Sequence, residues 1–129
     1  MIRAGVLIAL VGVAALAGCS DGTREVGRHK RMVAVRAGLY AIQAAPGGAL
    51  AKFDDVRLVG TTTVCGKVDG QDGAGPRRFA VAKGQVTIEQ PREPATVQAI
   101  AAACANAPSY RVISRNAGYT DIAVEDDPS

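Results

Sequence analysis

The stretch T-T-V-C-G-K-V (residues 62–68) decides the fold, because its side chains alternate in character. Val64 and Val68 fall on one side of an extended segment, whereas Cys65 and Lys67 fall on the other. A period of two is typical of a β-strand that buries one face. The stretch therefore predicts a strand with which neighbouring segments pair.

Similar alternating segments flank this strand in the sequence. A strand is predicted around residues 56–58, before it. After it, D-G-Q-D-G-A-G-P (69–76) has the glycine, proline and aspartate content of a loop. Two more strands are predicted over 78–81 and 86–88, joined by a tight turn at Lys83-Gly84. Together these segments predict a small antiparallel sheet of about four strands.

Helical spacing appears before and after the predicted strands. Four apolar residues recur every three or four positions in the first segment: Met32, Val35, Leu39 and Ile42. They predict an N-terminal helix with one apolar stripe, which Gly38 weakens. The alanine-rich residues 95–105 predict a C-terminal helix, with Thr96 as a candidate N-cap. We expect an α+β fold in which both helices pack on one face of the sheet.

The domain so defined covers residues 28–107. The remaining residues 108–129 leave two alternatives, a further hairpin or a partly disordered tail. Apolar residues near 110–113 and 122–124 favour the hairpin, and the acidic end of the chain favours the tail.

The first eighteen residues are typical of an export signal. Arg3 precedes a run from Ala4 to Ala17 that contains no charged or strongly polar side chain. A membrane-spanning helix needs about 20 apolar residues, so this run predicts a signal peptide rather than a span. One interpretation is an ordinary signal peptide with a chance cysteine near its cleavage site.

The stretch L-A-G-C (16–19) that ends this run resembles the lipobox of bacterial lipoproteins. The resemblance implies cleavage before Cys19, lipidation of its thiol and acylation of the new amino group. Several acyl chains hold a protein on a membrane stably. Residues 19–27 would form a short tether, and Ser20 implies sorting to the outer membrane, facing the periplasm. We therefore expect the membrane itself to be a partner, through the lipid anchor.

The charge balance of the exported chain is nearly neutral. Removal of residues 1–18 leaves 111 of the 129 residues, with 14 Lys and Arg against 12 Asp and Glu. The chain has no Trp, two Phe and three Tyr, which is too few for an aromatic stacking platform. We therefore expect one small domain without a nucleic-acid partner.

The cysteines divide into one candidate anchor and one candidate pair. If Cys19 carries lipid, Cys65 and Cys104 remain in an oxidising compartment, where a disulfide is expected. The chain-entropy treatment gives about 4 kcal/mol for closing a loop of this length. The alternative is a redox-active or nucleophilic cysteine. No C-x-x-C motif is present, however, and the single histidine, His29, is distant in sequence.

The mature domain is similar to a group of small uncharacterised exported proteobacterial proteins that read D-P-x-S-A-x-F, then V-C-G-x-V-N and Phe. The matching residues are Pro46, Ala51, Phe53, V-C-G-K-V at 64–68 and Phe79. The resemblance spans roughly residues 28–105, with Ala45 in place of the Asp and Asp69 in place of the Asn. It implies a fold and a partner for Cys65 near the C-terminus, but no activity.

Charged residues supply three candidate sites. The basic run R-H-K-R (28–31) is either a solvated helix start or a contact for anionic phosphate near the membrane. Asp54 and Asp55 could form a metal or acid/base pair, but neighbours on a strand point to opposite faces and would not serve one site. We therefore expect both carboxylates to face solvent. Within the 69–78 loop, Asp69, Asp72, Arg77 and Arg78 are the candidate binding residues.

The sequence favours a binding or structural module of the cell envelope. Its partner would be an envelope protein or polymer, and we expect no catalytic residue, metal or cofactor. The alternative is an envelope enzyme, or an inhibitor of one, that uses the 69–78 loop. No G-x-S-x-G motif and no phosphate-binding or calcium-binding loop pattern occurs in the sequence.

Overall fold

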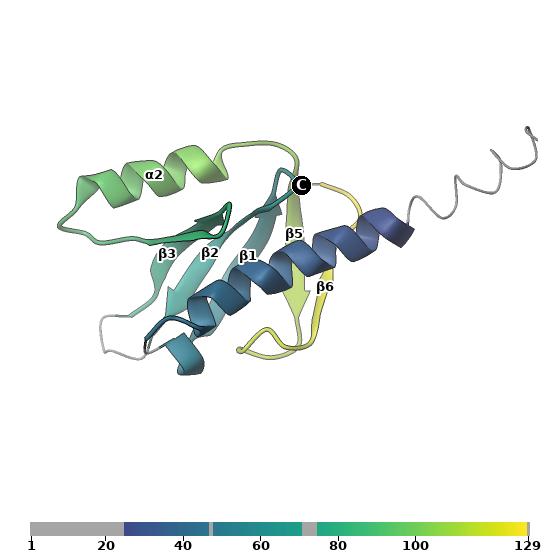
Figure 1. The fold of residues 1–129 in the computed structure, drawn as a ribbon, viewed down its shortest axis with the longest axis horizontal. Helices are drawn as coiled ribbons and strands as arrows, with labels where there is room; N and C mark the ends of the chain where they lie inside the picture. Colours follow the sequence, from purple (N-terminus) through teal and green to yellow (C-terminus); the bar gives the residue numbers. More distant parts are fainter. Residues whose placement is uncertain (1–24, 47, 71–74, 129) are drawn as a thin grey trace, which may run out of the picture. The chain divides into compact units, whose positions relative to one another are not determined.

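The computed structural model describes residues 25–46, 48–70 and 75–128 (Figure 1). The chain divides into two compact units, residues 1–30 and 31–129. Of the first unit, residues 25–30 are described, and they are helical. The sheet and the disulfide belong to the second unit. We use the term N-terminal helix for residues 31–43 of this unit.

The described residues form one six-stranded antiparallel sheet. Its strands are β1 (Lys52–Val59), β2 (Thr63–Asp69), β3 (Arg77–Ala82), β4 (Gln85–Ile88), β5 (Ser109–Ser114) and β6 (Ile122–Val124). They lie in the order β4-β3-β2-β1-β5-β6. The prediction of about four strands therefore understates the sheet, because the hairpin alternative for the C-terminal residues is the one observed.

The C-terminal hairpin joins the sheet along the free edge of β1. Leu58 pairs with Tyr110, and Val59 pairs with Ser109. Next to the start of β5, the backbone N–H of Gly60 donates to the carbonyl of Pro108 at 2.7 Å. These bonds satisfy backbone groups on an edge that would otherwise be open to another chain.

The meander from β1 to β4 follows the alternation in the sequence. The strands predicted over 62–68, 78–81 and 86–88 are confirmed as β2, β3 and β4. Lys83 and Gly84 both have positive φ, 51° and 78°, and they close the β3–β4 hairpin as predicted. Two consecutive residues of positive φ match the right-handed twist of paired strands, which is why such turns are common in hairpins.

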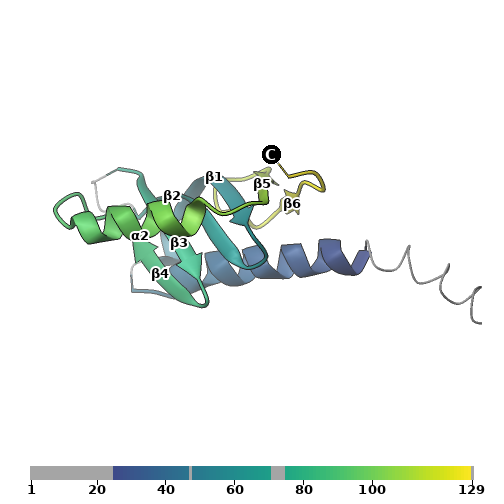
Figure 2. The ribbon, with the colours of Figure 1, turned by 90° about the horizontal axis from the view of Figure 1, so that it is seen from above.

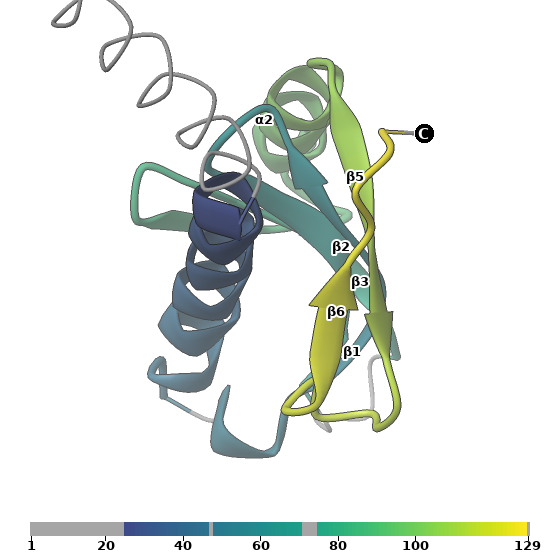
Figure 3. The same cartoon turned by 90° about the vertical axis from the view of Figure 1, so that its right-hand side faces the viewer.

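The two helices cover opposite faces of the sheet, as Figures 2 and 3 show. The N-terminal helix packs on the face that carries Val64 and Phe79, which we term the N-helix face. The other helix, α2 (Pro94–Cys104), packs on the face that carries Cys65 and Ala80, the α2 face. The prediction that both helices share one face is wrong, because consecutive residues of β2 and β3 point to opposite sides and each side meets its own helix.

The N-helix face carries the larger apolar core. Val35, Leu39 and Ile42 pack against buried residues of β1, β2, β3 and β5. Phe53 and Phe79 meet edge to face with ring centroids 5.9 Å apart. A short 3-10 helix, η1 (Gly48–Leu50), follows the N-terminal helix and leads into β1. This core supplies most of the burial that holds the domain together.

The start of α2 differs from the prediction. The helix begins at Pro94, and its N-cap is Glu93, which makes no side-chain capping bond. Thr96 therefore is not the N-cap but lies in the first turn. Its hydroxyl donates to the Glu93 carbonyl at 2.8 Å and accepts from the Gln90 N–H at 2.9 Å. Proline favours the first helical position because it lacks the N–H that would have no partner there.

Candidate functional site

A disulfide fixes α2 to the sheet and forms one wall of the candidate site. Cys65 on β2 is bonded to Cys104 at the end of α2, 39 positions later, with Cα atoms 6.1 Å apart. The predicted disulfide is thus confirmed. The apolar core on this face is small, consisting of Val59, Cys65, Ala80 and Ile100. The covalent bond therefore supplements a modest burial.

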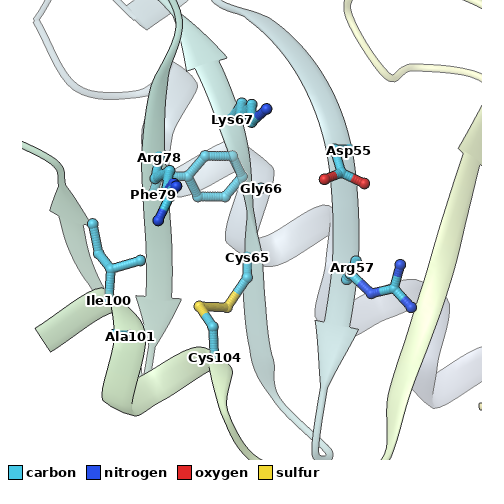
Figure 4. Close-up of a pocket in the computed structure, with 10 residues that line it drawn as sticks. All are labelled: Asp55, Arg57, Cys65, Gly66, Lys67, Arg78, Phe79, Ile100, Ala101 and Cys104. Atoms are coloured by element: carbon cyan, nitrogen blue, oxygen red, sulfur yellow. A yellow bond between two sulfur atoms is a disulfide. The ribbon is translucent and has the colours of Figure 1, made fainter. Parts of the chain in front are cut away.

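An open groove of about 210 Å³ lies beside this disulfide on the α2 face (Figure 4). Ile100, Ala101 and the disulfide supply its apolar side. Its charged side chains come from three adjacent strands: Asp55 and Arg57 from β1, Lys67 from β2 and Arg78 from β3. Three positive charges and one negative charge thus stand on a rigid part of the sheet.

Lys67 and Arg78 are direct cross-strand neighbours in the β2–β3 register. Both side chains belong to exposed residues. In the part of the chain that the structure describes, neither makes an ion pair or a side-chain hydrogen bond. Two like charges directly opposite each other on a sheet destabilise it, so this pair lowers stability in the absence of a counter-charge.

Arg57 is held in place by the neighbouring hairpin. It is half-buried, and its Nε donates to the Ser109 hydroxyl at 2.8 Å. In the β1–β5 register it stands opposite Arg111, which makes a second like-charge pair on the same face. Arg111 is partly compensated by Glu125, whose carboxylate lies 3.5 Å from its guanidinium.

A β-bulge in β1 changes the direction of the acidic pair. The register shifts between Asp54 and Arg57, and Asp55 has a positive φ of 51°. Asp54 stands opposite Lys67, and Asp55 lines the same groove as Lys67. Both residues are exposed, as predicted, but the strand alternation on which that prediction relied is interrupted here by the bulge.

The bulge is braced from the N-helix face by Tyr119. Its ring meets Phe53 edge to face, with centroids 6.0 Å apart. Burial raises the pKa of the Tyr119 hydroxyl above its ordinary value, and the charges of Asp54 and Asp55 raise it further. A hydrogen bond with the backbone of Val56 opposes this rise. The phenol therefore stays neutral over the physiological range and contacts the backbone of the bulge.

The predicted loop residues separate in the structure. Asp69 ends β2, while Arg77 and Arg78 begin β3. Asp72 lies outside the described residues. Arg78 lines the groove on the α2 face, whereas Arg77 lies on the other side, with Nη1 3.5 Å from Gln90 Oε1. Of the three candidates that the structure describes, only Arg78 lines the groove.

Two groove residues were missed in the sequence, namely Arg57 and Lys67. The alternation contains a signal for both. Arg57 lies between the buried residues Val56 and Leu58, and Lys67 precedes the buried residue Val68. Once the strands are paired, Arg57, Lys67 and Arg78 fall on the α2 face of three adjacent strands. The pairing register, rather than any motif, identifies them.

The basic run is divided between the two units. Arg31 Nη2 lies 3.3 Å from Asp126 Oδ1, and its guanidinium lies 4.9 Å from the centre of the Tyr110 ring. Arg31 therefore fastens the N-terminal helix to the C-terminal segment instead of being solvated. Arg28, His29 and Lys30 are exposed. The candidate anchor, Cys19, lies outside the described residues.

The described residues contain no cluster of three or more His, Cys, Asp or Glu that could hold a metal ion. Within the same residues, no helix has both the length and the hydrophobicity needed to cross a membrane. Comparison with protein-family models, curated proteins and solved structures finds no match to the chain. The function therefore has to be inferred from the groove and the sequence.

Proposed function

We propose that this chain is a lipid-anchored binding module of the cell envelope, and that the α2 face of its sheet is the binding surface. The observation that carries the proposal is the charged groove beside the Cys65–Cys104 disulfide. Arg57, Lys67 and Arg78 stand on three paired strands there. Side chains on paired strands are held more rigidly than side chains on loops, which favours a preorganised contact surface.

The anchoring part of the proposal rests on L-A-G-C at residues 16–19. The predicted tether of residues 19–27 is too long by three residues, because residues 25–27 are helical. Cleavage before Cys19 would leave residues 19–24 as the tether, which spans at most about 20 Å when fully extended. The domain would therefore act close to the membrane surface, on the periplasmic side of the outer membrane. An oxidising compartment of this kind also permits the Cys65–Cys104 bond.

The groove supports binding better than catalysis. Its polar groups are three cations and the carboxylate of Asp55. General acid–base or nucleophilic chemistry needs a nucleophile or proton acceptor aligned with a second group. The groove is also open to solvent, whereas enzymes commonly enclose the reacting groups.

The anchor is tested by intact-mass spectrometry of the protein extracted from membranes. The expected mass is that of residues 19–129 with three acyl chains and with two thiols that an alkylating reagent modifies only after reduction. A mature chain without lipid, or one with both thiols alkylated before reduction, would contradict the proposal.

The binding surface is tested by crosslinking in intact envelopes. A photo-reactive amino acid is placed at Lys67 in the groove or, as a matched control, at Arg36, which is exposed on the N-terminal helix. We expect the Lys67 position to form a specific adduct that the Arg36 position does not form. Equal adduct patterns from the two positions would argue against the groove as the contact surface.

A further inference from the structure

Lys67 and Arg78 form a like-charge pair, and neither side chain makes an ion pair or a hydrogen bond among the described residues. Their Cβ atoms, as direct cross-strand neighbours, are expected to be about 4.5–5.5 Å apart. The carboxylate closest in register is Asp54, on the other side of Lys67. Its Oδ1 accepts the backbone N–H of Asp55 at 2.9 Å, and it makes no ion pair with Lys67 among the described residues. The hydrogen-bond donors of Lys67 and Arg78 are therefore available to a ligand.

We infer that this groove binds a phosphate or carboxylate group, with Lys67 and Arg78 as its direct contacts. An oxyanion between the two side chains would convert their repulsion into two charge-assisted hydrogen bonds. The guanidinium of Arg78 presents paired donors that match the geometry of such a group, and the ammonium of Lys67 adds a compact positive charge. Arg57 contributes a third positive charge, already oriented by Ser109.

The surroundings of the pair strengthen an interaction with an anion. Ile100, Ala101 and the disulfide form an apolar wall on one side of the groove. Apolar walls lower the local dielectric and reduce the screening of charges by water. Asp55 lines the groove at its β1 side and repels an anion there. Its carboxylate can instead accept a hydrogen bond from a hydroxyl or amine of the same ligand.

The inference rests on the proposed function, because it names the chemical class recognised by the proposed binding surface. An oxyanion in the envelope comes either from a lipid headgroup or from a soluble polymer. Both present the same phosphate or carboxylate chemistry to Lys67 and Arg78. The experiment therefore establishes anion binding first and then separates the two sources.

The test is a titration of the isotope-labelled full chain in a neutral detergent, followed by backbone amide NMR. Inorganic phosphate and acetate are the probes, and chloride at equal ionic strength is the reference. We expect the amides of β2 and β3 near Lys67 and Arg78 to shift with phosphate or acetate but not with chloride. Lys67→Glu should lower the affinity about tenfold or more, because it removes a charge-assisted bond and adds a repulsive charge.

Two further variants make the result specific. Lys67→Arg keeps the positive charge and should retain binding, and Arg36→Glu makes the same kind of charge reversal away from the groove and should leave binding unchanged. The melting temperature of Lys67→Glu in the absence of phosphate checks that the variant is folded. It should stay close to that of the parent chain, because the new carboxylate faces an opposite charge in Arg78 and a like charge in Asp54.

The inference is overturned if chloride shifts the same amides equally, or if Lys67→Glu binds phosphate as well as the parent chain. Competition experiments then identify the source of the bound anion. Soluble polyphosphate represents a polymer, and phosphatidylglycerol vesicles represent a lipid headgroup. A competitor is accepted as the source if it displaces bound phosphate from the parent chain but has no such effect in Lys67→Glu. Failure of both to do so at any concentration would also count against the inference. The titration is independent of lipidation, so an absent lipid on Cys19 would contradict the proposed anchor alone.

Discussion

The two faces of the sheet are stabilised in different ways, although the same strands form both. The N-helix face buries a continuous core in which Val35, Leu58 and Phe79 are fully buried. The α2 face buries only a small cluster around Ile100 and adds the Cys65–Cys104 bond. Beyond that cluster it carries the charged side chains of the groove.

The difference shows how a small domain divides its surface between stability and binding. Burial of apolar area on the N-helix face contributes most of the hydrophobic stabilisation. A disulfide stabilises without requiring a large apolar area, since it acts mainly on the unfolded chain. The α2 face can therefore keep Lys67 and Arg78 exposed while α2 remains in place. The predictions below test this division, beginning with the largest expected effect.

The first prediction concerns the core of the N-helix face. Phe79→Ala should lower the free energy of unfolding by about 3–5 kcal/mol, because it removes a fully buried ring and leaves a cavity. Ile113→Ala is the control on the α2 face, where Ile113 is 45% exposed, and it should cost less than about 1 kcal/mol. Urea unfolding followed by circular dichroism measures both. Similar losses for the two variants would show that the faces do not differ as described.

The second prediction concerns the disulfide. Replacing both cysteines in Cys65→Ala/Cys104→Ala should lower the free energy of unfolding by about 2–4 kcal/mol, because the unfolded chain regains its freedom. Amide hydrogen exchange should then rise more in α2 than in the N-terminal helix, whose contacts do not depend on the bond. Uniformly raised exchange in both helices would indicate that the disulfide supports the whole domain rather than the α2 face.

The third prediction concerns the close approach of the N-terminal helix to β2. A Cβ on Gly38 would lie 2.6 Å from Val64 Cγ2, which is too close for unrelieved contact. Gly38→Ala should therefore lower the free energy of unfolding by about 1–3 kcal/mol through overpacking. The higher helix propensity of alanine should offset about 1 kcal/mol of this loss.

The double variant Gly38→Ala/Val64→Ala provides the matched control for this prediction. Because Val64→Ala removes the clashing methyl groups, the cost of adding Gly38→Ala should largely disappear in that background. A double-mutant cycle by urea unfolding measures the coupling. Additive effects of the two changes would mean that the helix moves away from β2 instead of being held against it.

The smallest expected effect concerns Tyr119 at alkaline pH. Its pKa is raised in the folded chain, chiefly by burial, so the unfolded chain ionises first as the pH increases. The stabilisation is complete below the ordinary tyrosine pKa of about 10 and is lost as the pH rises through the folded value. Tyr119→Phe should therefore lose less stability than the parent chain between pH 8 and pH 11.

Urea unfolding at the two pH values measures this difference, and absorbance titration of the tyrosines in the folded chain provides a second readout. The absorbance change at the highest pH should be missing in Tyr119→Phe. An identical alkaline loss of stability in both chains would mean that Tyr119 ionises equally readily in the folded and unfolded states.

Much of the fold was predictable from the residues that lie next to one another in the sequence. Alternation located β2, β3 and β4, and helical spacing located the stripe of Val35, Leu39 and Ile42. The turn at Lys83-Gly84 and the pairing of Cys65 with Cys104 were also predicted. These features depend on local geometry or on residue type alone, and so a single sequence contains enough information to identify them.

The candidate site was less predictable, because it depends on how distant segments pair. Arg57, Lys67 and Arg78 share a face only through the registers of β1 with β2 and of β2 with β3. The bulge at Asp55 is likewise invisible in the alternation of β1, since it follows from the shift in the β1–β2 register between Asp54 and Arg57. For this reason Arg78 is the one residue of the described part of the 69–78 loop that lines the groove.

The sequence by itself determined which residues of each strand are apolar, where the chain turns and which cysteines can bond. Only the tertiary structure decided that the helices cover opposite faces and that the C-terminal hairpin completes the sheet along β1. The tertiary structure also explains Gly38. Glycine weakens an isolated helix, but here the missing side chain leaves room for Val64 of β2 to pack against the helix. The physical reason is that the pattern of apolar residues in a sequence indicates which side chains are buried. It does not indicate which helix or strand covers them, because that depends on packing between segments far apart in the chain.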